Sequence, residues 1–380
     1  MALTEDHETF RQTVRGVCQR VIAPHADKWE QEGIWPAHDV LPAFAEAGLL
    51  GLEYDPKWGG QGADNTYTAV FAEELGRAGC AGVAMGITDH TDMATPSLHR
   101  FGSDELKEKY LVPALKGEHV AGIAVTEPDA GSDVAGIRSK AVRDGDEWII
   151  NGSKMFITNA MQADWLCLLV RTSEEGGHRG MSQIVFPTKT DGFEARSLHK
   201  LGNKSSDTCE LTFDDCRVPV ANTIGTIGRG FQQQMQQFQN ERMVASYSAV
   251  GSMQKALAET AAYLKERKAF GKPLLANQHI QFELAQLAAE VDMLKVYNYA
   301  AAEAASAGKD ITREATMAKV KVGPLLRRVI DTCLQFHGGM GYMEETWTAR
   351  AFRDARLISI GGGADEVMIQ YLALLEGYVA

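Results

Sequence analysis

The sequence lacks the short motifs by which several common enzyme classes are identified. It has no GxGxxG segment after a strand pattern, because GTIGRG at residues 225–230 has a different spacing and falls in a predicted loop. It also has no GxxxxGKS/T, no HExxH and no GxSxG. These absences argue against a nicotinamide-binding Rossmann domain, a P-loop nucleotidase, a zinc protease and a serine hydrolase with a nucleophile elbow.

Cysteine and histidine are present but are not arranged as metal ligands. The six cysteines include no CxxC pair, and none of the ten histidines lies at a spacing typical of a metal site. We therefore expect reduced, mostly buried thiols and no bound metal. The cysteines are Cys18, Cys80, Cys167, Cys209, Cys216 and Cys333.

Basic residues are fewer than acidic ones, since 38 Lys and Arg stand against 50 Asp and Glu, for a formal net charge of -12. This balance argues against non-specific binding to nucleic acid or to an anionic membrane, although a local basic pocket could hold a phosphorylated ligand. No apolar run is long enough to span a bilayer, and the N-terminus resembles neither a signal peptide nor a transit peptide. We expect a cytoplasmic, bacterial protein without a membrane span, while a processed protein of the mitochondrial matrix stays open.

At 380 residues the chain exceeds one ordinary core, and its periodicity changes twice along its length. Helical spacing predominates up to about residue 118, short strand patterns follow, and helical patterns return near residue 226. We therefore predict an α+β protein with an N-terminal all-α domain (1–118), a central antiparallel β-barrel or sandwich (119–225) and a C-terminal helical domain (226–380).

Local signals refine this outline. Asp144-Gly145 and Asn151-Gly152 are typical of hairpin turns between strands. The pattern from Phe231 to about Phe270 predicts a single long helix that is followed by Gly and Pro.

Three segments resemble signature motifs of the acyl-CoA dehydrogenase family. The first is TEPDAGSD followed by NGSKMFITNA (126–133 and 151–160), and the second is LKERKAFGKPLLANQ (264–278). The third runs from QFHGGMGYMEE to RAFRDARLISIGGGADEVM (335–368). They stand in the family's order and spacing, so the resemblance covers essentially the whole chain. It implies an FAD-dependent enzyme acting on acyl-CoA thioesters, with a C-terminal domain built as a four-helix bundle.

The resemblance assigns the first segment to the flavin ring. A flavin needs hydrogen-bond donors along the edge of its isoalloxazine and an aromatic wall that keeps water away. Thr126, Thr158 and backbone amides near Val125 can supply the donors, and Phe156 stands where the family usually has tryptophan. By the same resemblance, Ser132 bridges the flavin phosphate and the pantetheine of the acyl-CoA, although Gly-Ser-Asp taken alone favours a simple turn.

The other two segments contain residues that the resemblance places against the FAD of a neighbouring subunit. Arg267, Phe270 and Gln278 match positions that reach this second FAD, with the guanidinium of Arg267 suited to bidentate contact with the pyrophosphate. Gln335 and Gly339 match positions at the adenosine end, where glycine permits close backbone approach. The alternative for Arg267 is a solvated charge at a helix end. If the assignment holds, function requires an oligomer, and the family implies a homotetramer built as a dimer of dimers.

The position of the catalytic base departs from the family's usual pattern. Most members carry this carboxylate in the C-terminal signature, where this sequence has Gly362 within GGGADEV. The isovaleryl-CoA and long-chain acyl-CoA dehydrogenases carry it instead in a Glu-Arg pair on the long helix before the RKxFG motif. Here that pair is Glu241-Arg242, and its spacing to Arg267 agrees with that subgroup.

The residues around Glu241 support this assignment on physical grounds. Phe238, Ala245 and Ala249 share its face of the predicted helix, so its carboxyl points to a mainly apolar side rather than to solvent. Desolvation there would raise its pKa toward neutrality, which suits a general base. The alternative is a surface carboxylate on a long helix.

Other polar residues of the same region have less specific expected roles. Arg242 could fix the helix position or meet the CoA. Asp365 and Glu366 are rival acids, but at the predicted start of the last helix they fit first-turn carboxylates favoured by the helix dipole. Glu366 could also touch the flavin.

The predicted reaction is FAD-dependent α,β-dehydrogenation of an acyl-CoA to the trans-2-enoyl-CoA, with electrons passed to an electron-transfer flavoprotein. The flavin ribityl hydroxyl and the Gly362 amide would polarise the thioester carbonyl. The acyl chain could be branched, medium or long, depending on how helices near residues 85–95 and 238–247 pack. The alternatives are an enoyl-CoA reductase, a flavin oxidase or a nitroalkane oxidase on the same scaffold, or a flavin-binding regulatory protein, against which the acidic charge argues.

Overall fold

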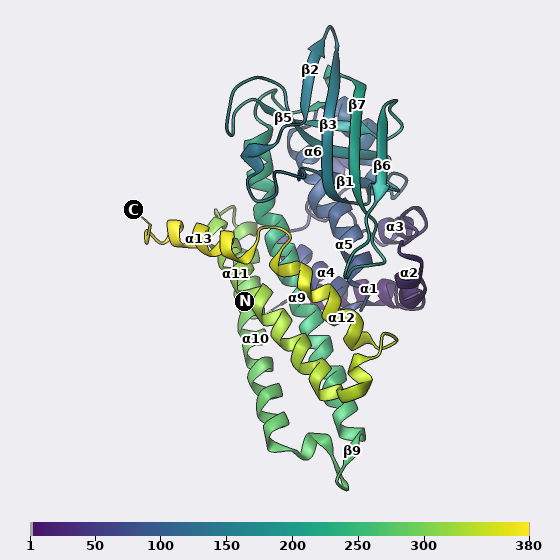
Figure 1. Cartoon of the computed structure of the whole chain (residues 1–380), viewed down its shortest axis with the longest axis vertical. Helices are drawn as coiled ribbons and strands as arrows, with labels where there is room; N and C mark the ends of the chain where they lie inside the picture. The colour runs from purple at the N-terminus through teal and green to yellow at the C-terminus, as the bar shows by residue number, and fades with distance from the viewer. Residues whose placement is uncertain (1–2, 380) are drawn as a thin grey trace.

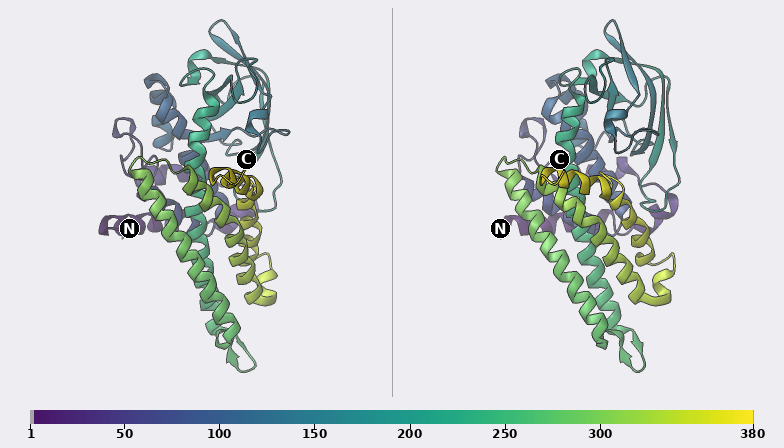
Figure 2. Two further views of the ribbon diagram at one scale, coloured as in Figure 1. Left: turned by 90° about the vertical axis from the view of Figure 1, so that its left-hand side faces the viewer. Right: turned by 60° about the vertical axis from the view of Figure 1, so that its left-hand side comes forward.

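A computed structural model of the chain describes residues 3–379 and has the predicted order of helices, sheet and helices (Figure 1). The sheet lies at one end of the elongated molecule and the long C-terminal helices extend away from it (Figure 2). Within the described residues no helix has both the length and the apolar character needed to cross a bilayer. The α+β fold class is therefore confirmed, while the residue boundaries of the three domains and the location in the cell stay predictions.

The N-terminal block is made of short helices around aromatic residues. Trp35, Phe44 and Phe71 are buried in the same cluster as Trp165 of the sheet, so this block and the sheet share one core. Between residues 81 and 101 the helices α5 and α6 are joined by a π-helical turn, η2. The helices are α1 Glu5–Val21, α2 Ala26–Glu32, α3 Ala37–Glu46, α4 Asn65–Arg77, α5 Ala81–Thr88, η2 Asp89–Ala94, α6 Thr95–Phe101, α7 Asp104–Leu106, η3 Lys107–Leu111 and α8 Val112–Leu115.

The middle of the chain forms one eight-stranded sheet with the order β6-β7-β3-β2-β4-β5-β8, and β1 pairs with β4. Buried residues from β3, β4, β5 and β7 belong to one cluster, so the sheet curls around its own core. The strands are β1 Ala121–Ala124, β2 Lys140–Asp144, β3 Glu147–Thr158, β4 Trp165–Arg171, β5 Met181–Pro187, β6 Phe193–Ser197, β7 Thr208–Pro219 and β8 Thr223–Ile224.

Two sequence predictions about the sheet need correction. The sheet is mixed rather than purely antiparallel, because β1 runs parallel to β4 and β2 touches β4 in parallel register. The pair Asn151-Gly152 is not a hairpin turn, since β3 continues through it with a bulge against β7. Gly152 has a φ of 143°, and a Cβ there would lie 2.5 Å from Ser139 Oγ, so glycine is required by space as well as by backbone conformation. The turn at Asp144-Gly145 is confirmed, since it joins β2 to β3.

The C-terminal part is organised by three long helices, α9, α10 and α11, which run side by side and share a buried core (Figures 1 and 2). The small strands β9 and β10 form a hairpin between α9 and α10, and α9 ends at Glu266 rather than near Phe270. The shorter α12 and α13 pack against α11. The elements are α9 Gly230–Glu266, β9 Lys268–Ala269, β10 Lys272–Pro273, α10 Gln278–Ser306, α11 Thr312–His337, α12 Trp347–Ala355 and α13 Asp365–Leu375.

Helix α9 connects all three parts of the molecule. It crosses α4 so closely that a Cβ on Gly76 would lie 1.8 Å from Ser248 O, and one on Gly251 would lie 1.9 Å from Glu73 O. It also packs against β5 and η2. The half of α9 that carries Glu241 therefore lies where the N-terminal helices, the sheet and the C-terminal helices meet. The six cysteines are free and buried, as predicted.

Candidate active site

Glu241 is buried at this junction, with 8% of its surface exposed. Its Oε1 accepts a hydrogen bond of 2.9 Å from Nε2 of Gln237, one helical turn earlier. The amide of Gln237 is itself oriented, because Ser97 Oγ donates to its Oε1 at 2.5 Å and its Nε2 also donates to the carbonyl of Met93. One carboxylate oxygen of Glu241 is thus fixed by a neighbour that is held from α6 and η2.

Burial raises the pKa of Glu241 to about 7, because the ionised carboxylate loses its hydration. The Gln237 hydrogen bond and the charge of Arg242 act in the opposite direction but do not cancel this effect. The carboxyl is therefore ionised in an appreciable fraction of molecules at neutral pH and can accept a proton there.

Two further carboxyls, on η2, lie within electrostatic reach of Glu241. Asp89 and Asp92 have pKa values raised well above the usual range, first by burial and then by other carboxylates, with the charge of Glu241 among them. The charge of Glu53 also raises the pKa of Asp92. Sequence reasoning missed both residues, and the signal was the pair of acids within TDHTD in an otherwise apolar helical stretch.

The glycine segment 361–363 lies beside the same part of α9. Gly362 has a φ of +65°, which favours glycine, and Arg242 Nε lies 3.4 Å from its carbonyl oxygen. A Cβ at Gly362 would meet only the side chain of Lys319, at 3.7 Å, so the position is open. No acceptor within residues 3–379 takes the Gly362 N–H.

Lys319 holds this glycine segment and was not identified from the sequence. Its Nζ donates to the carbonyls of Ile358 at 2.5 Å and of Gly363 at 2.8 Å. Burial lowers the pKa of Lys319 to about 8, although the charge of Asp365 raises it in part. Asp365 and Glu366 lie in the first turn of α13, as predicted, and Glu366 is exposed.

The residues expected to face the flavin are brought together at the end of β1 and of β3. Met155 N donates to Thr126 O at 2.8 Å, which places Thr126 beside the strand that carries Phe156 and Thr158. Phe156 has a φ of 64° and is 66% exposed, so its ring faces away from the core. Val125 follows β1 directly.

A buried ion pair fixes the residues that are predicted to face the flavin, and sequence reasoning missed it. Lys154 is 0% exposed and donates from Nζ to Val125 O at 2.8 Å and to Glu127 Oε1 at 2.9 Å. Glu127 also accepts from the backbone amides of Arg138 and Ser139. Ser132 lies on the exposed loop that starts after Glu127, and the hydrogen bonds of the Glu127 carboxylate to Arg138 and Ser139 join the two ends of this loop. A lysine facing inward in a strand of alternating polarity was the available signal.

The remaining predicted cofactor residues lie at the opposite end of the molecule, around the β9–β10 hairpin (Figure 1). Phe270 occupies the hairpin tip, fully exposed, with a φ of 51°. The start of α10 and the end of α11 meet here, since the ring centroids of His279 and Phe336 are 6.4 Å apart. This group, called the tip group below, comprises the exposed residues Arg267, Phe270, Gln278, Gln335 and Gly339.

The two groups fit different parts of FAD. An exposed aromatic ring beside two threonine hydroxyls suits a planar isoalloxazine, and an exposed guanidinium suits a pyrophosphate. The long helices separate the tip group from the sheet (Figures 1 and 2), so one chain does not bring both groups to one cofactor.

Comparisons with known proteins agree with this architecture. Family models match residues 4–118 as "Acyl-CoA dehydrogenase, N-terminal domain", 122–216 as the middle domain and 228–374 as the C-terminal domain. The chain is 35% identical to a probable acyl-CoA dehydrogenase, YngJ, of Bacillus subtilis over 96% of each chain. It is 35% identical to the mitochondrial long-chain specific acyl-CoA dehydrogenase of Mus musculus over 97% of this chain and 86% of that protein. A crystal structure of a probable acyl-CoA dehydrogenase from Mycobacterium abscessus superposes with a TM-score of 0.95 at 38% identity, covering 98% of this chain and 99% of that one.

Proposed function

Because the chain belongs to the acyl-CoA dehydrogenase family, we propose that it oxidises an acyl-CoA thioester to the trans-2-enoyl-CoA with Glu241 as the base. The protein is an oxidoreductase of this family, and its cofactor is FAD. When bound, FAD supplies the two-electron oxidant that takes the β-hydrogen of the acyl group. Binding of the thioester and removal of its α-proton fall to the chain's own residues.

The observation that carries the proposal is the burial of Glu241 with a pKa raised to about 7. A base that removes a weakly acidic α-proton works best when its pKa lies near the working pH. Gln237 binds one oxygen of the carboxylate and leaves the other to receive the proton. Desolvation is the largest cause of the raised pKa, which means that the buried carboxylate binds this proton more tightly than an exposed one would.

The open position at Gly362 supports the same assignment. Without a side chain there, the segment leaves room for the thioester and presents the Gly362 N–H as a donor to its carbonyl oxygen. Such a donor stabilises the negative charge that develops on this oxygen when the α-proton leaves. Arg242 and Lys319 bond to carbonyls of the same segment and so orient its amides.

We assign the flavin ring to Val125, Thr126, Phe156 and Thr158, the CoA and flavin phosphate to Ser132, and the flavin edge to Glu366. Arg242 would meet the CoA as well as the glycine segment. The separation of the tip group from the sheet supports its assignment to the FAD of a second subunit, and therefore an obligate oligomer. We propose a homotetramer built as a dimer of dimers.

The subgroup and the electron acceptor are part of the proposal. A glutamate on the long helix and a glycine in the C-terminal signature favour the isovaleryl-CoA and long-chain acyl-CoA dehydrogenases. The electrons would then pass to an electron-transfer flavoprotein.

Anaerobic titration of the purified FAD-containing protein with a panel of saturated acyl-CoAs tests the function. The flavin absorbance should bleach with at least one of them and should return when electron-transfer flavoprotein is added. Return with oxygen instead would indicate an oxidase, and reoxidation only by enoyl-CoA would indicate a reductase. Absence of bleaching with every acyl-CoA, while FAD stays bound, would overturn the proposal.

A further inference from the structure

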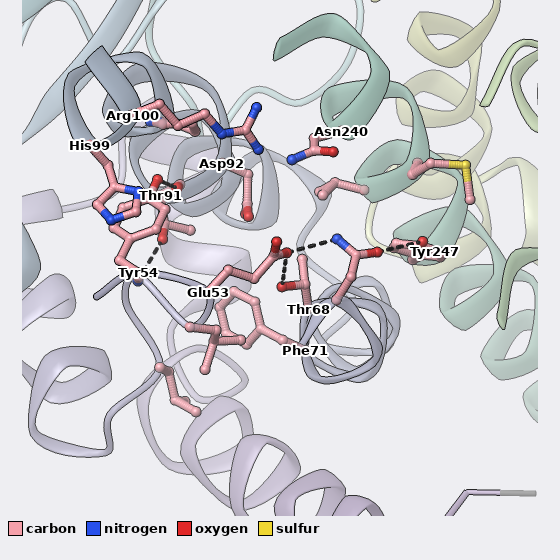
Figure 3. Close-up of a pocket in the computed structure, with 17 residues that line it drawn as sticks. Glu53, Tyr54, Thr68, Phe71, Thr91, Asp92, His99, Arg100, Asn240 and Tyr247 are labelled. Carbon is pink, nitrogen blue, oxygen red and sulfur yellow. Dashed lines mark hydrogen bonds between the residues drawn. The ribbon is translucent and has the colours of Figure 1, made fainter. Parts of the chain in front are cut away.

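A cavity of about 210 Å³ lies between η2 and the part of α9 next to Glu241, with Asp92 and Asn240 in its wall (Figure 3). The loop 49–54, α4, η2, α6 and α9 enclose it, which includes the two helical segments expected to set the depth of the acyl pocket. Its lining is polar on several sides. The polar side chains in its wall include Glu53, Tyr54, Asn65, Thr68, Asp92 and Asn240.

Asp92 links this cavity to the proposed base. It lines the cavity. The charges of Glu53 and of Glu241 both raise the pKa of Asp92, so its carboxyl lies within electrostatic reach of each. Figure 3 shows Asp92 and Glu53 directed toward the same space. A chain that extends from a thioester beside Glu241 toward this cavity therefore passes Asp92.

The polar groups of the cavity are not all used within the protein. Asn65 Nδ2 and Thr68 Oγ1 both donate to Glu53 Oε1 at 2.7 Å. The Oδ2 of Asp92 is buried and has no hydrogen-bond partner within residues 3–379. A buried carboxyl oxygen without a partner is unfavourable unless a ligand or water satisfies it.

The outer end of the cavity opens into a surface groove. Arg100 and Asn240 line both spaces, and the groove continues along Gln236 and Gln239 of α9 to the end of α10 and the loop that follows it, at 305–311. An acyl group longer than the inner cavity can therefore continue outward between polar side chains.

We propose, on the basis of the dehydrogenase function above, that this cavity receives the far end of the acyl chain and selects acyl groups that carry hydroxyl groups there. An alkyl end would leave Asp92 Oδ2 without a hydrogen-bond partner, whereas a hydroxyl can donate to the Asp92 or the Glu53 carboxyl and accept from Asn240. Sites built to hydrogen-bond a hydroxyl reject the analogue that lacks it more strongly than apolar pockets reject an added hydroxyl.

Matched pairs of straight-chain acyl-CoA and ω-hydroxyacyl-CoA of increasing length test the proposal on the FAD-containing enzyme. The rate constant of anaerobic flavin bleaching at limiting substrate gives the preference for each pair. We expect the hydroxylated member to be favoured by about tenfold or more once the chain reaches the cavity. Asp92→Leu should abolish or reverse this preference, and Asp39→Leu, which removes an exposed carboxyl on α3 outside the cavity, should leave it unchanged.

The outcomes separate the inference from the function on which it rests. Equal or faster bleaching by the alkyl member at every length, with no effect of Asp92→Leu, would overturn the inference and leave the dehydrogenase function intact. If no acyl-CoA of either kind bleaches the flavin, the proposed function itself fails, and the inference fails with it. Should Asp92→Leu lose FAD, the Asn240→Leu variant provides the same comparison, and an unchanged preference in it would count against the inference.

Discussion

Replacement of Glu241 by glutamine should make the stability of the protein less dependent on pH. The pKa of this carboxyl is raised from 4.5 to about 7 in the folded chain, so the folded state holds its proton more tightly than the unfolded state does. Well below pH 4.5 the carboxyl is protonated in both states and its burial has no electrostatic cost. As the pH rises to about 7, the unfolded state releases its proton first and the native state loses stability relative to it.

The size of this effect follows from the shift. A difference between 4.5 and about 7 corresponds to about 3 kcal/mol, fully developed above neutral pH. The Glu241→Gln variant keeps the shape of the side chain but carries no charge, so it escapes this loss. The charge of Glu241 also helps to raise the pKa values of Asp89 and Asp92. Its removal lessens the repulsion between these carboxyls, which likewise stabilises the variant relative to the wild type at high pH.

Urea unfolding of both proteins at about pH 5 and at about pH 8 measures the difference. The stability of Glu241→Gln relative to the wild type should increase between the two conditions by about 2.5 kcal/mol, because about 1 kcal/mol of the effect has already developed at the lower pH. Glu259→Gln, on the same helix but partly exposed beside Lys255, is the matched control and should show no such trend. An identical pH dependence in the wild type and Glu241→Gln would refute the argument that Glu241 is desolvated.

Three further substitutions test other parts of the structure. Lys154→Met leaves Glu127 buried without its cation, so we expect a loss of about 3–5 kcal/mol in urea unfolding and weaker FAD retention; wild-type values would contradict the role of this pair. Gly76→Ala places a Cβ 1.8 Å from Ser248 O, so forcing the helices apart should cost at least about 1–3 kcal/mol, and an unchanged unfolding midpoint would show that α4 and α9 do not cross so closely. Arg267→Ala should release FAD on gel filtration without changing the circular dichroism of the protein, and full FAD retention would argue against a contact with the pyrophosphate.

The order of the elements could be predicted because it depends on local periodicity. The alternation along β3 and the spacing of apolar residues on α9 are visible in sequence, and so is the glycine turn at Asp144-Gly145. The dipeptide Asn151-Gly152 wrongly predicted a hairpin turn, and the reason is physical. The same backbone freedom that permits a tight turn also permits a bulge, and pairing with β7 decides between them.

The burial of Glu241 was predictable from its helix face, but its partners were not. Gln237 is one turn away and could have been suspected, whereas the carboxyls of η2 and Lys319 come from distant segments. A lysine or aspartate in a helical pattern is normally exposed, so only tertiary packing reveals that these are inside. Likewise, the exposure of Phe156 results from its left-handed backbone in β3, which the sequence does not specify.

The most direct test of Glu241 as the base is the rate of anaerobic flavin bleaching, followed by stopped flow, in the wild type and in Glu241→Gln saturated with the same acyl-CoA. Glu366→Gln, which changes an exposed carboxylate of α13, serves as the comparison for the rival acid. The proposed role predicts that Glu241→Gln keeps its FAD but bleaches about 10²–10⁴-fold more slowly, while Glu366→Gln still bleaches. Bleaching by Glu241→Gln at a rate close to that of the wild type would contradict it.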